Sequence, residues 1–218
     1  MVRDLLIYCM EWIGTVAFAV SGALVAIGSG LDLFGVIIVG SITAVGGGIM
    51  RDLLLGYTPP RVFESPETLL VAMFTGVVVF VVAWINVRRF RDLQKKVESI
   101  NVVFDAIGLA AFSVTGVEVA VESGFGDNFL LTLLMGVMTG VGGGVLRDVL
   151  VNEKPYILTR HIYAVASILG SIIYYLLRTG TSYRVLGTFL SVGVTILIRL
   201  LAAHYRWSLP KISFDKEK

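Results

Sequence analysis

Hydrophobic residues gather into long runs, each close to the length of a membrane-spanning helix. Seven such runs lie at 5–27, 33–55, 67–87, 100–121, 128–151, 160–178 and 184–204. About 20 apolar helical residues cross the hydrocarbon core of a bilayer, so each run predicts one transmembrane helix. The breaks between runs are short and rich in glycine, proline or charge. The pattern predicts an all-α integral membrane protein with seven transmembrane helices and almost no chain left for a soluble domain.

Composition agrees with a chain surrounded by lipid. Of 218 residues, 56% are hydrophobic and 16% are charged, and the mean hydropathy is +0.85. A soluble domain carries about 25% charged residues because its surface faces water. The net charge of +2, with no basic stripe outside the loops, speaks against nucleic acid as a partner. The single cysteine, Cys9, excludes an intrachain disulfide and a cysteine-based metal site.

Basic residues predict the orientation in the membrane. The strongest positive cluster lies at 88–96, between the third and fourth runs, and holds five Lys or Arg residues. Positively charged loops stay on the cytoplasmic side. Counting spans from this loop places the N-terminus outside and the basic C-terminal tail inside. We therefore expect an integral protein of the cell (inner) membrane with an external N-terminus and a cytoplasmic C-terminus.

The first three runs resemble the next three. Residues 11–22 (EWIGTVAFAVSG) match 105–116 (DAIGLAAFSVTG) at an offset of 94, and 44–52 (AVGGGIMRD) match 140–148 (GVGGGVLRD) at an offset of 96. Because each repeat holds an odd number of spans, the second copy enters the membrane upside down, an arrangement typical of transporters and channels. The predicted units are a first repeat (1–87), a basic cytoplasmic linker (88–99), a second inverted repeat (100–178), a seventh helix (179–205) and a cytoplasmic tail (206–218).

Three consecutive glycines stand in the second and in the fifth run. They are Gly46, Gly47, Gly48 and Gly142, Gly143, Gly144. Glycine is less favourable than alanine in a helix by about 1 kcal/mol per residue, so the triplets are expected to break both helices and bare their carbonyl groups. Irregular backbone at membrane depth is tolerated only where protein buries it or where it lines a wet cavity. This interpretation makes the triplets part of an ion pathway, with cations held transiently near the carbonyls and no fixed metal site.

The same glycines also fit close helix packing. Small residues four positions apart form a row in each helix, at 40, 44 and 48 and at 136, 140 and 144. Such rows let helices approach closely in lipid without lining anything. For Gly40 and Gly136 packing is the favoured interpretation. A packing groove needs only one helix face, so the consecutive triplets favour the break.

An adjacent Arg–Asp pair follows each triplet about one helical turn on. The pairs are Arg51–Asp52 and Arg147–Asp148. Their duplication on opposite sides of an inverted fold favours gating or charge compensation at the two mouths of a pathway. The alternative is that each pair bonds to itself or reaches toward the nearby interface.

Further polar residues lie inside the predicted helices. Glu11 and Asp105 are equivalent acids, and an acid in a membrane span is a functional candidate, but both lie near a membrane boundary. A functional and a structural role stay equally open for them. Hydroxyl groups that could line the pathway belong to Ser21, Thr43, Ser113, Thr115 and Thr139. Hydrogen bonding between helices would explain each of these taken alone.

Enzyme motifs are not found. No Gly-Lys-Ser or Gly-Lys-Thr follows a glycine run, and neither a Gly-x-Ser-x-Gly elbow nor an HExxH zinc motif occurs. We expect a protein that is not an enzyme and that needs no cofactor.

Three features of the sequence occur together: the paired GGG-x-x-Arg-Asp motifs, the matching E/D-x-x-G-x-x-A-F-x-x-S/T-G helices and the three-plus-three-plus-one layout. In these features the chain resembles the bacterial members of the trimeric intracellular cation (TRIC) channel family. The resemblance covers essentially the whole chain. It implies a homotrimer in lipid with one cation pore per protomer, potassium and sodium as permeant ions, and kinks at both triplets in the second and fifth helices. The same group has a proposed role in glycine transport. A secondary transporter of a small solute such as glycine is therefore the alternative, because an inverted repeat also suits alternating access.

Overall fold

The computed structural model describes residues 2–87, 94–159, 162–180 and 183–207, which form helices joined by short turns with no β-strand among them. Within these ranges, seven helices are long and apolar enough to cross a membrane. They are α1 (Val2–Gly28), α2 (Leu33–Leu54), α3 (Glu67–Ile85), α5 (Gln94–Ala120), α6 (Phe129–Leu150), α8 (Ile162–Gly180) and α9 (Arg184–His204). Three short segments complete the described chain, namely a 3-10 turn η1 (Arg61–Phe63), a π-helical turn η2 (Val121–Phe125) and α7 (Tyr156–Thr159). The predicted all-α fold with seven spans is confirmed.

The two halves of the chain begin their second helix in the same way. The Asp32 side chain caps α2 by accepting a hydrogen bond of 2.8 Å from the Gly35 amide. The Asn128 side chain caps α6 by accepting one of 3.1 Å from the Leu131 amide. Both bonds satisfy an amide that has no partner within its own helix. The sequence repeat is thus matched by a repeated helix start.

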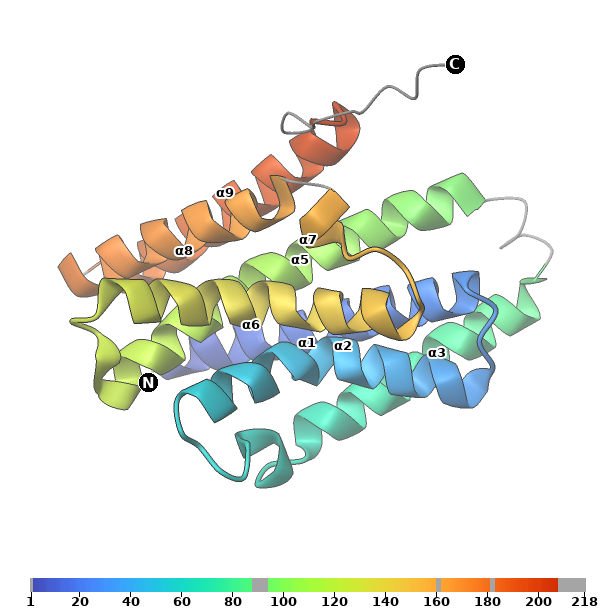
Figure 1. The fold of residues 1–218 in the computed structure, drawn as a ribbon, viewed down its shortest axis with the longest axis horizontal. Coiled ribbons are helices and arrows are strands. Elements are labelled where there is room, and N and C mark those ends of the chain that lie inside the picture. Colours follow the sequence, from blue (N-terminus) through green and yellow to red (C-terminus); the bar gives the residue numbers. More distant parts are fainter. Residues whose placement is uncertain (1, 88–93, 160–161, 181–182, 208–218) are drawn as a thin grey trace, which may run out of the picture.

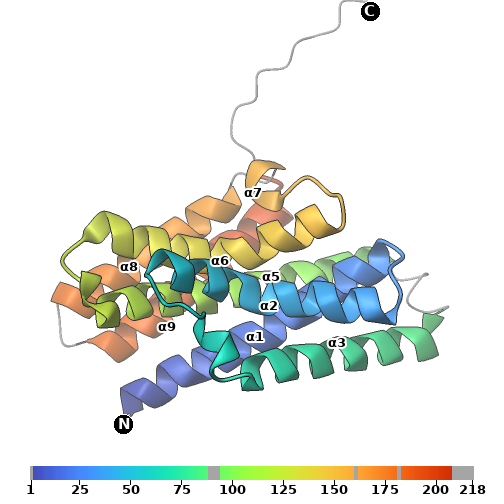
Figure 2. The same cartoon turned by 60° about the horizontal axis from the view of Figure 1, so that its bottom comes forward.

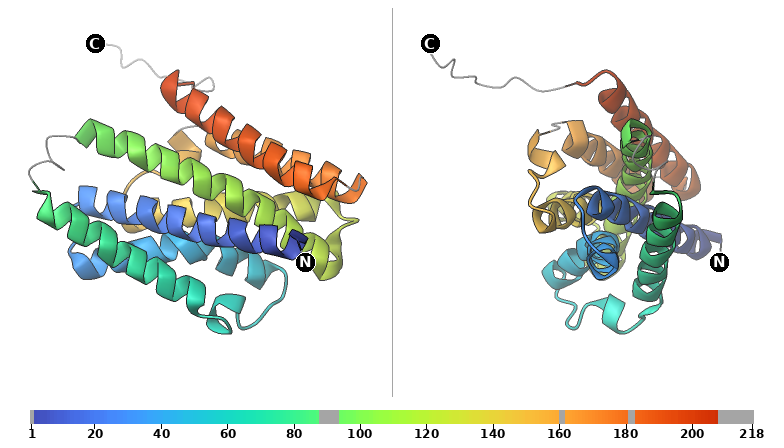
Figure 3. Two further views of the ribbon diagram at one scale, coloured as in Figure 1. Left: turned by 180° about the vertical axis from the view of Figure 1, so that it is seen from behind. Right: turned by 90° about the vertical axis from the view of Figure 1, so that its right-hand side faces the viewer.

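The long helices pack in two layers. In Figure 1, α8, α6 and α2 lie side by side toward the viewer, and the reverse view in Figure 3 shows α9, α5, α1 and α3 side by side behind them. Figure 2 shows α3 along one edge, next to α1 and α2. Extensive contacts run from α1 to α2, α2 to α6, α6 to α5 and α5 back to α1, whereas α1 with α6 and α2 with α5 hardly touch. These four helices form a ring, which we call the four-helix ring.

Side chains are distributed as expected for a protein in lipid. Large apolar residues face outward, and on α3 both Phe74 and Trp84 are 69% exposed. Small and polar residues fill the interior, including Ala19, Ser21 and Thr43, all of which are buried. Because polar groups cannot be hydrated by hydrocarbon, burying them between helices is the stable arrangement.

Helix α5 begins before the fourth apolar run of the sequence. Helix α5 starts at Gln94 rather than at 100, so it occupies the last part of the predicted 88–99 linker. Residues 94–98 read QKKVE, and Gln, Lys and Glu are all good helix formers, which explains why the helix extends beyond its apolar part. Residues 88–93, with three of the five basic residues of the cluster, and the tail residues 208–218 lie outside the described residues.

The predicted break at the glycine triplets is wrong. Helices α2 and α6 stay helical through both triplets. The reason is close packing, because α2 and α6 cross antiparallel at this point. A Cβ atom on Gly47 would overlap the carbonyl oxygen of Thr139, and one on Gly143 would overlap that of Thr43. Glycine therefore brings the two backbones together while the helical hydrogen bonds remain.

Packing also explains the outer glycines, as predicted. A Cβ atom on Gly40 would lie 3.1 Å from the carbonyl oxygen of Ala19, so α2 presses against α1 there. One on Gly136 would lie 3.0 Å from the carbonyl oxygen of Ser113, so α6 presses against α5. The four-helix ring is thus held together by glycines at several of its contacts.

Candidate functional site

The two triplets meet in the four-helix ring with near-twofold symmetry. Gly46 faces the side chain of Leu146 on α6, and Gly142 faces the Met50 sulfur on α2, where a Cβ atom would lie 3.1 Å from Sδ. Met50 and Leu146 are equivalent residues at an offset of 96. The first two glycines of each triplet are therefore fully used in the crossing of α2 and α6.

The third glycine of each triplet faces an arginine instead. A Cβ atom on Gly48 would lie 3.7 Å from Nη2 of Arg51, and one on Gly144 would lie 3.8 Å from Nη2 of Arg147 and 3.0 Å from the Tyr163 hydroxyl oxygen. The missing side chain leaves room for the guanidinium one turn further along the same helix. This is a direct link between the triplet and the charged pair that follows it.

Two phenylalanines fill the ring near the crossing. The ring centroids of Phe18 on α1 and Phe112 on α5 lie 5.3 Å apart, and both side chains are buried. Phe18 packs on Gly108, and Phe112 packs on the equivalent Gly14. Each aromatic ring occupies the space that a side chain on the opposing helix would need. The middle of the four-helix ring is consequently closed in this structure.

Each Arg–Asp pair forms its own ion pair. Arg51 donates to Oδ1 of Asp52 through Nε at 2.9 Å and Nη2 at 2.7 Å, and Arg147 donates through Nε to Oδ1 of Asp148 at 2.8 Å. The second oxygen of each carboxylate accepts a backbone amide of the following loop. Asp52 accepts from Arg61 at 3.0 Å and Asp148 from Tyr156 at 2.8 Å. The aspartates therefore tie the end of each helix to the loop that leaves it.

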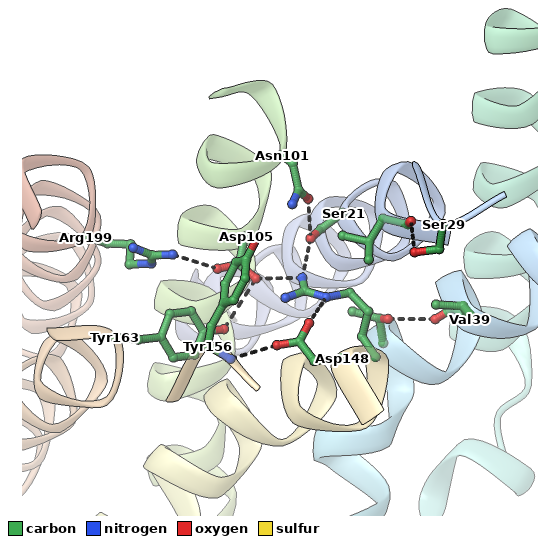
Figure 4. Close-up of polar contacts among 12 residues, drawn as sticks. Ser21, Ser29, Val39, Asn101, Asp105, Asp148, Tyr156, Tyr163 and Arg199 are labelled. Atoms are coloured by element: carbon green, nitrogen blue, oxygen red, sulfur yellow. Dashed lines mark hydrogen bonds and ion pairs between the residues drawn. The ribbon is translucent and has the colours of Figure 1, made fainter. Parts of the chain in front are cut away.

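Arg147 reaches further than its counterpart. Its Nη1 donates to Ser21 Oγ at 2.6 Å and to Asp105 Oδ1 at 2.9 Å, which links α6 to α1 and α5 (Figure 4). Ser21 in turn donates to Oδ1 of Asn101 at 2.7 Å. Arg147 is fully buried, with an exposed fraction of 0%. Charges buried this deeply are stable only when they are paired and hydrogen-bonded.

Helices α8 and α9 add two residues to the same group. Tyr163 donates to Asp105 Oδ1 at 3.4 Å, and Nη2 of Arg199 lies 3.7 Å from Asp105 Oδ2. The Arg199 guanidinium also lies over the Tyr163 ring, 4.9 Å from its centroid. Asp105 thus lies between two arginines. We call the whole set the buried charge network, and its members are Ser21, Asn101, Asp105, Arg147, Asp148, Tyr163 and Arg199.

The described part of the first repeat has no matching network. Glu11, the counterpart of Asp105, is exposed on α1, and among the described residues Arg51 pairs with Asp52 alone. The structure therefore separates two acids that the sequence left equivalent. Asp105 belongs to the site, and Glu11 does not.

The candidate hydroxyl groups also differ. Thr43 and Thr139 donate to carbonyl oxygens of their own helices, Val39 and Met135, each at 2.6 Å. Ser113 Oγ lies 2.6 Å from Oγ of Ser167 on α8, and Thr115 donates to the Phe112 carbonyl oxygen at 3.3 Å. Of the five candidates, Ser21 alone joins the buried charge network.

A second polar cluster lies at the opposite ends of α5 and α8. Glu118 accepts from the Tyr174 hydroxyl at 2.9 Å and from Nε of Arg178 at 2.6 Å. Nearby, the Tyr57 hydroxyl and Ser123 Oγ lie 3.0 Å apart, which joins the loop after α2 to η2. The bond with Ser123, helped by Arg61, lowers the pKa of Tyr57. At this end of the molecule, polar contacts therefore join α5 to α8 and the loop after α2 to η2.

Sequence reasoning overlooked Arg199 and Glu118. Each is a charged residue inside an apolar run, Arg199 in 184–204 and Glu118 in 100–121. Charged residues within membrane spans are rare and usually functional or paired, so this signal was available. Asn101 and Tyr163 gave no comparable signal, because polar residues near helix ends are common.

Known proteins resemble this chain along most of its length. A family model described as "Glycine transporter" matches residues 8–84 and 102–179, the two segments that hold the predicted repeats. The chain is 39% identical to the UPF0126 inner membrane protein YadS of Escherichia coli (strain K12), covering 97% of this chain and 99% of that relative. It is 36% identical to the UPF0126 membrane protein YvgT of Bacillus subtilis (strain 168), covering 93% and 94%.

Solved structures show the same fold. The TRIC trimeric intracellular cation channel orthologue from Rhodobacter sphaeroides is 34% identical, with a TM-score of 0.82 over 93% of this chain and 99% of that one. A second chain, solved to explain conductance through TRIC cation channels, is 36% identical, with a TM-score of 0.77 over 96% and 98%. The chain therefore belongs to the TRIC family of membrane transport proteins and is not an enzyme.

Proposed function

We propose that this protein is a channel for monovalent cations, potassium and also sodium, with one pathway in each protomer along the four-helix ring. The observation that carries the proposal is the buried charge network. Oxygen atoms of Ser21, Asp105 and Asp148 surround a single cation, the Arg147 guanidinium. Likeness to solved cation channels over almost the whole chain supports the same assignment.

The network suggests how a permeant ion would be held. Potassium and sodium are coordinated in channels by carbonyl or carboxylate oxygens that replace their water. With α2 and α6 continuous, the carbonyl groups at Gly46–Gly48 and Gly142–Gly144 are engaged in helical hydrogen bonds. Side-chain oxygens are then the better ligands. If Arg147 moves aside, Ser21 and Asp105 face the pathway and can receive a cation in its place.

Gating follows from the same geometry. Arg147 with Asp148 closes one end of the ring, and Phe18 with Phe112 closes its middle. Arg51 with Asp52 occupies the equivalent position at the other end. Conduction requires that α1 and α5 shift against α2 and α6, which separates the two phenylalanines and moves the guanidinium. The glycine contacts permit such sliding because they present no side chain to obstruct it.

The second candidate is a secondary transporter of glycine, which the description of the matching family model favours. An Arg–Asp pair could hold the carboxylate and ammonium groups of such a solute. Purified protein in liposomes distinguishes the two functions. We expect a potassium gradient to dissipate through the protein with no saturable uptake of labelled glycine. Glycine uptake that saturates, without potassium flux, would support the transporter instead.

We propose that the functional form is a homotrimer in lipid. The support is the broad exposed apolar face that includes α3 and α9, together with the trimeric assembly stated for the Rhodobacter sphaeroides orthologue. Native mass spectrometry in mild detergent is expected to give three copies of the 23.6 kDa chain. A monomer that persists in several detergents and in lipid nanodiscs would contradict this.

The orientation is a further expected result. The 88–99 linker and the 206–218 tail are proposed to be cytoplasmic and the N-terminus external, because positively charged loops are retained inside. This places Arg147 at the cytoplasmic end of the ring and Arg51 at the outer end. A C-terminal green fluorescent protein fusion should fluoresce, and a C-terminal alkaline phosphatase fusion should be inactive. An active phosphatase fusion would reverse the assignment.

A further inference from the structure

Two oppositely charged side chains of the buried charge network face each other without a hydrogen bond. Nη2 of Arg199 lies 3.7 Å from Oδ2 of Asp105, and Figure 4 shows the guanidinium reaching from α9 toward the carboxylate. Both side chains are buried. Among the described residues, neither Oδ2 of Asp105 nor Nε or Nη2 of Arg199 has a hydrogen-bond partner. Buried charges are costly unless they are hydrogen-bonded, so this ion pair is incomplete in the structure.

The two oxygens of Asp105 face different arginines. Oδ1 accepts a hydrogen bond from Nη1 of Arg147 at 2.9 Å, whereas Oδ2 faces Arg199. Arg147 belongs to α6 and is also bonded to Asp148 on the same helix of the four-helix ring. Arg199 belongs to α9, which lies outside that ring. Asp105 therefore has one arginine on the side of the proposed pathway and one on the side of α9, and of these two only the first is hydrogen-bonded to it.

Arg199 is held by α8 rather than by α6. Its guanidinium lies over the ring of Tyr163 on α8, 4.9 Å from the centroid. About two turns earlier on α9, Ser191 donates to the carbonyl oxygen of Gly170 on α8 at 2.7 Å. A movement of α5 against α6, as proposed for gating, would separate Asp105 from the α6 arginine and leave Arg199 within reach. Less than about 1 Å of approach would then give a charge-assisted hydrogen bond.

We propose that Arg199 is a positioning residue for Asp105, which pairs with Oδ2 when Arg147 withdraws and offsets part of the carboxylate charge. This inference rests on the proposed channel function and specifies how its ion site is regulated. The pair fixes the carboxylate with Oδ1 toward the pathway. An uncompensated buried carboxylate would hold a cation firmly, whereas conduction requires that ions leave as readily as they enter. Arg199 therefore weakens the site enough for rapid passage.

Unitary conductance measured against potassium concentration tests this role. In Arg199→Gln the carboxylate keeps its full charge, so the half-saturating potassium concentration should fall by at least about threefold. The maximal conductance should fall as well, because each ion leaves more slowly. Arg199→Lys retains the positive charge and should recover part of both values. Arg184→Gln, at the opposite end of α9, is the matched control and should give the wild-type curve.

This readout separates positioning of Asp105 from a role of Arg199 in folding. A folding defect lowers the number of active channels, but it leaves unchanged the potassium concentration at which each open channel saturates. A wild-type saturation curve in conducting Arg199→Gln would overturn the proposal.

A structure of folded Arg147→Gln tests the same pair without altering Arg199 and without any current. We expect Nη2 of Arg199 to lie within about 3.2 Å of Asp105 Oδ2. One arginine of the network then faces two acids, Asp105 and Asp148, so an excess negative charge remains. A separation that stays at 3.7 Å or more would contradict the inference. A closed pair in this variant, together with a wild-type protein that conducts no cations, would support the pairing and overturn only the proposed function.

Discussion

Replacing Gly47 or Gly143 with leucine is expected to prevent stable folding or assembly, not merely to silence the currents of an assembled protein. The first carbon of the new side chain would overlap the carbonyl oxygen of Thr139 or Thr43 on the facing helix. Overpacking a core usually costs about 1–3 kcal/mol, and here the obstacle is backbone that cannot rotate away. We expect a loss of at least about 3 kcal/mol in the free energy of unfolding, measured in mixed detergent micelles.

Two other glycines serve as controls for this prediction. Gly193 lies in α9 with no atom within 4 Å of a Cβ placed on it, so Gly193→Leu should fold normally. Gly48→Ala would meet only the flexible end of Arg51, at 3.7 Å. If Gly47→Leu and Gly143→Leu assemble as well as Gly193→Leu, the packing role assigned to the triplets would be wrong.

Removing Arg147 should have a much larger effect than removing Arg51. Arg147→Gln leaves Asp148 without its cation and Asp105 with only the more distant Arg199. Breaking a buried ion pair by removing one partner costs about 3–5 kcal/mol in the free energy of unfolding. Arg51→Gln, which affects Asp52 alone, is the matched control and should cost less. Thermal unfolding of the two purified variants provides the comparison.

The same variants report on gating. If Arg147 closes the pathway, folded Arg147→Gln should show a higher open probability than the wild type in planar bilayers. Adding Asp105→Asn should recover part of the lost stability, because it removes one of the unpaired charges. Equal stability and equal open probability for Arg147→Gln and Arg51→Gln would mean that the buried charge network has no special role.

The fold was predictable because its strongest signals are local. Seven apolar runs of spanning length and a three-helix unit that occurs twice determine the number of helices and their inverted arrangement. Helix boundaries were less accurate where polar residues are good helix formers, as at the start of α5. No pattern in the sequence distinguishes a helix that ends with its apolar run from one that extends into water.

The site was only partly predictable. The Arg–Asp pairs and Asp105 were recognised as candidates, but the sequence could not show that Asp105 is buried while Glu11 is exposed. That difference arises partly from packing of α5 against α9, which has no counterpart in the first repeat. The glycine triplets were misread because glycine both weakens a helix and permits close approach. Which effect dominates depends on the facing helix, here the carbonyl groups of Thr43 and Thr139.

The central claim is that this protein conducts cations, and single-channel recording tests it most directly. Purified protein is fused into a planar bilayer with a potassium chloride gradient, and the sign of the reversal potential reports the charge of the permeant ion. We predict unitary openings that reverse near the potassium equilibrium potential and persist when sodium replaces potassium. Because a carrier moves far fewer ions per second than an open pore, resolved unitary currents exclude carrier transport. Silent bilayers containing protein that takes up glycine in parallel liposomes would contradict the account.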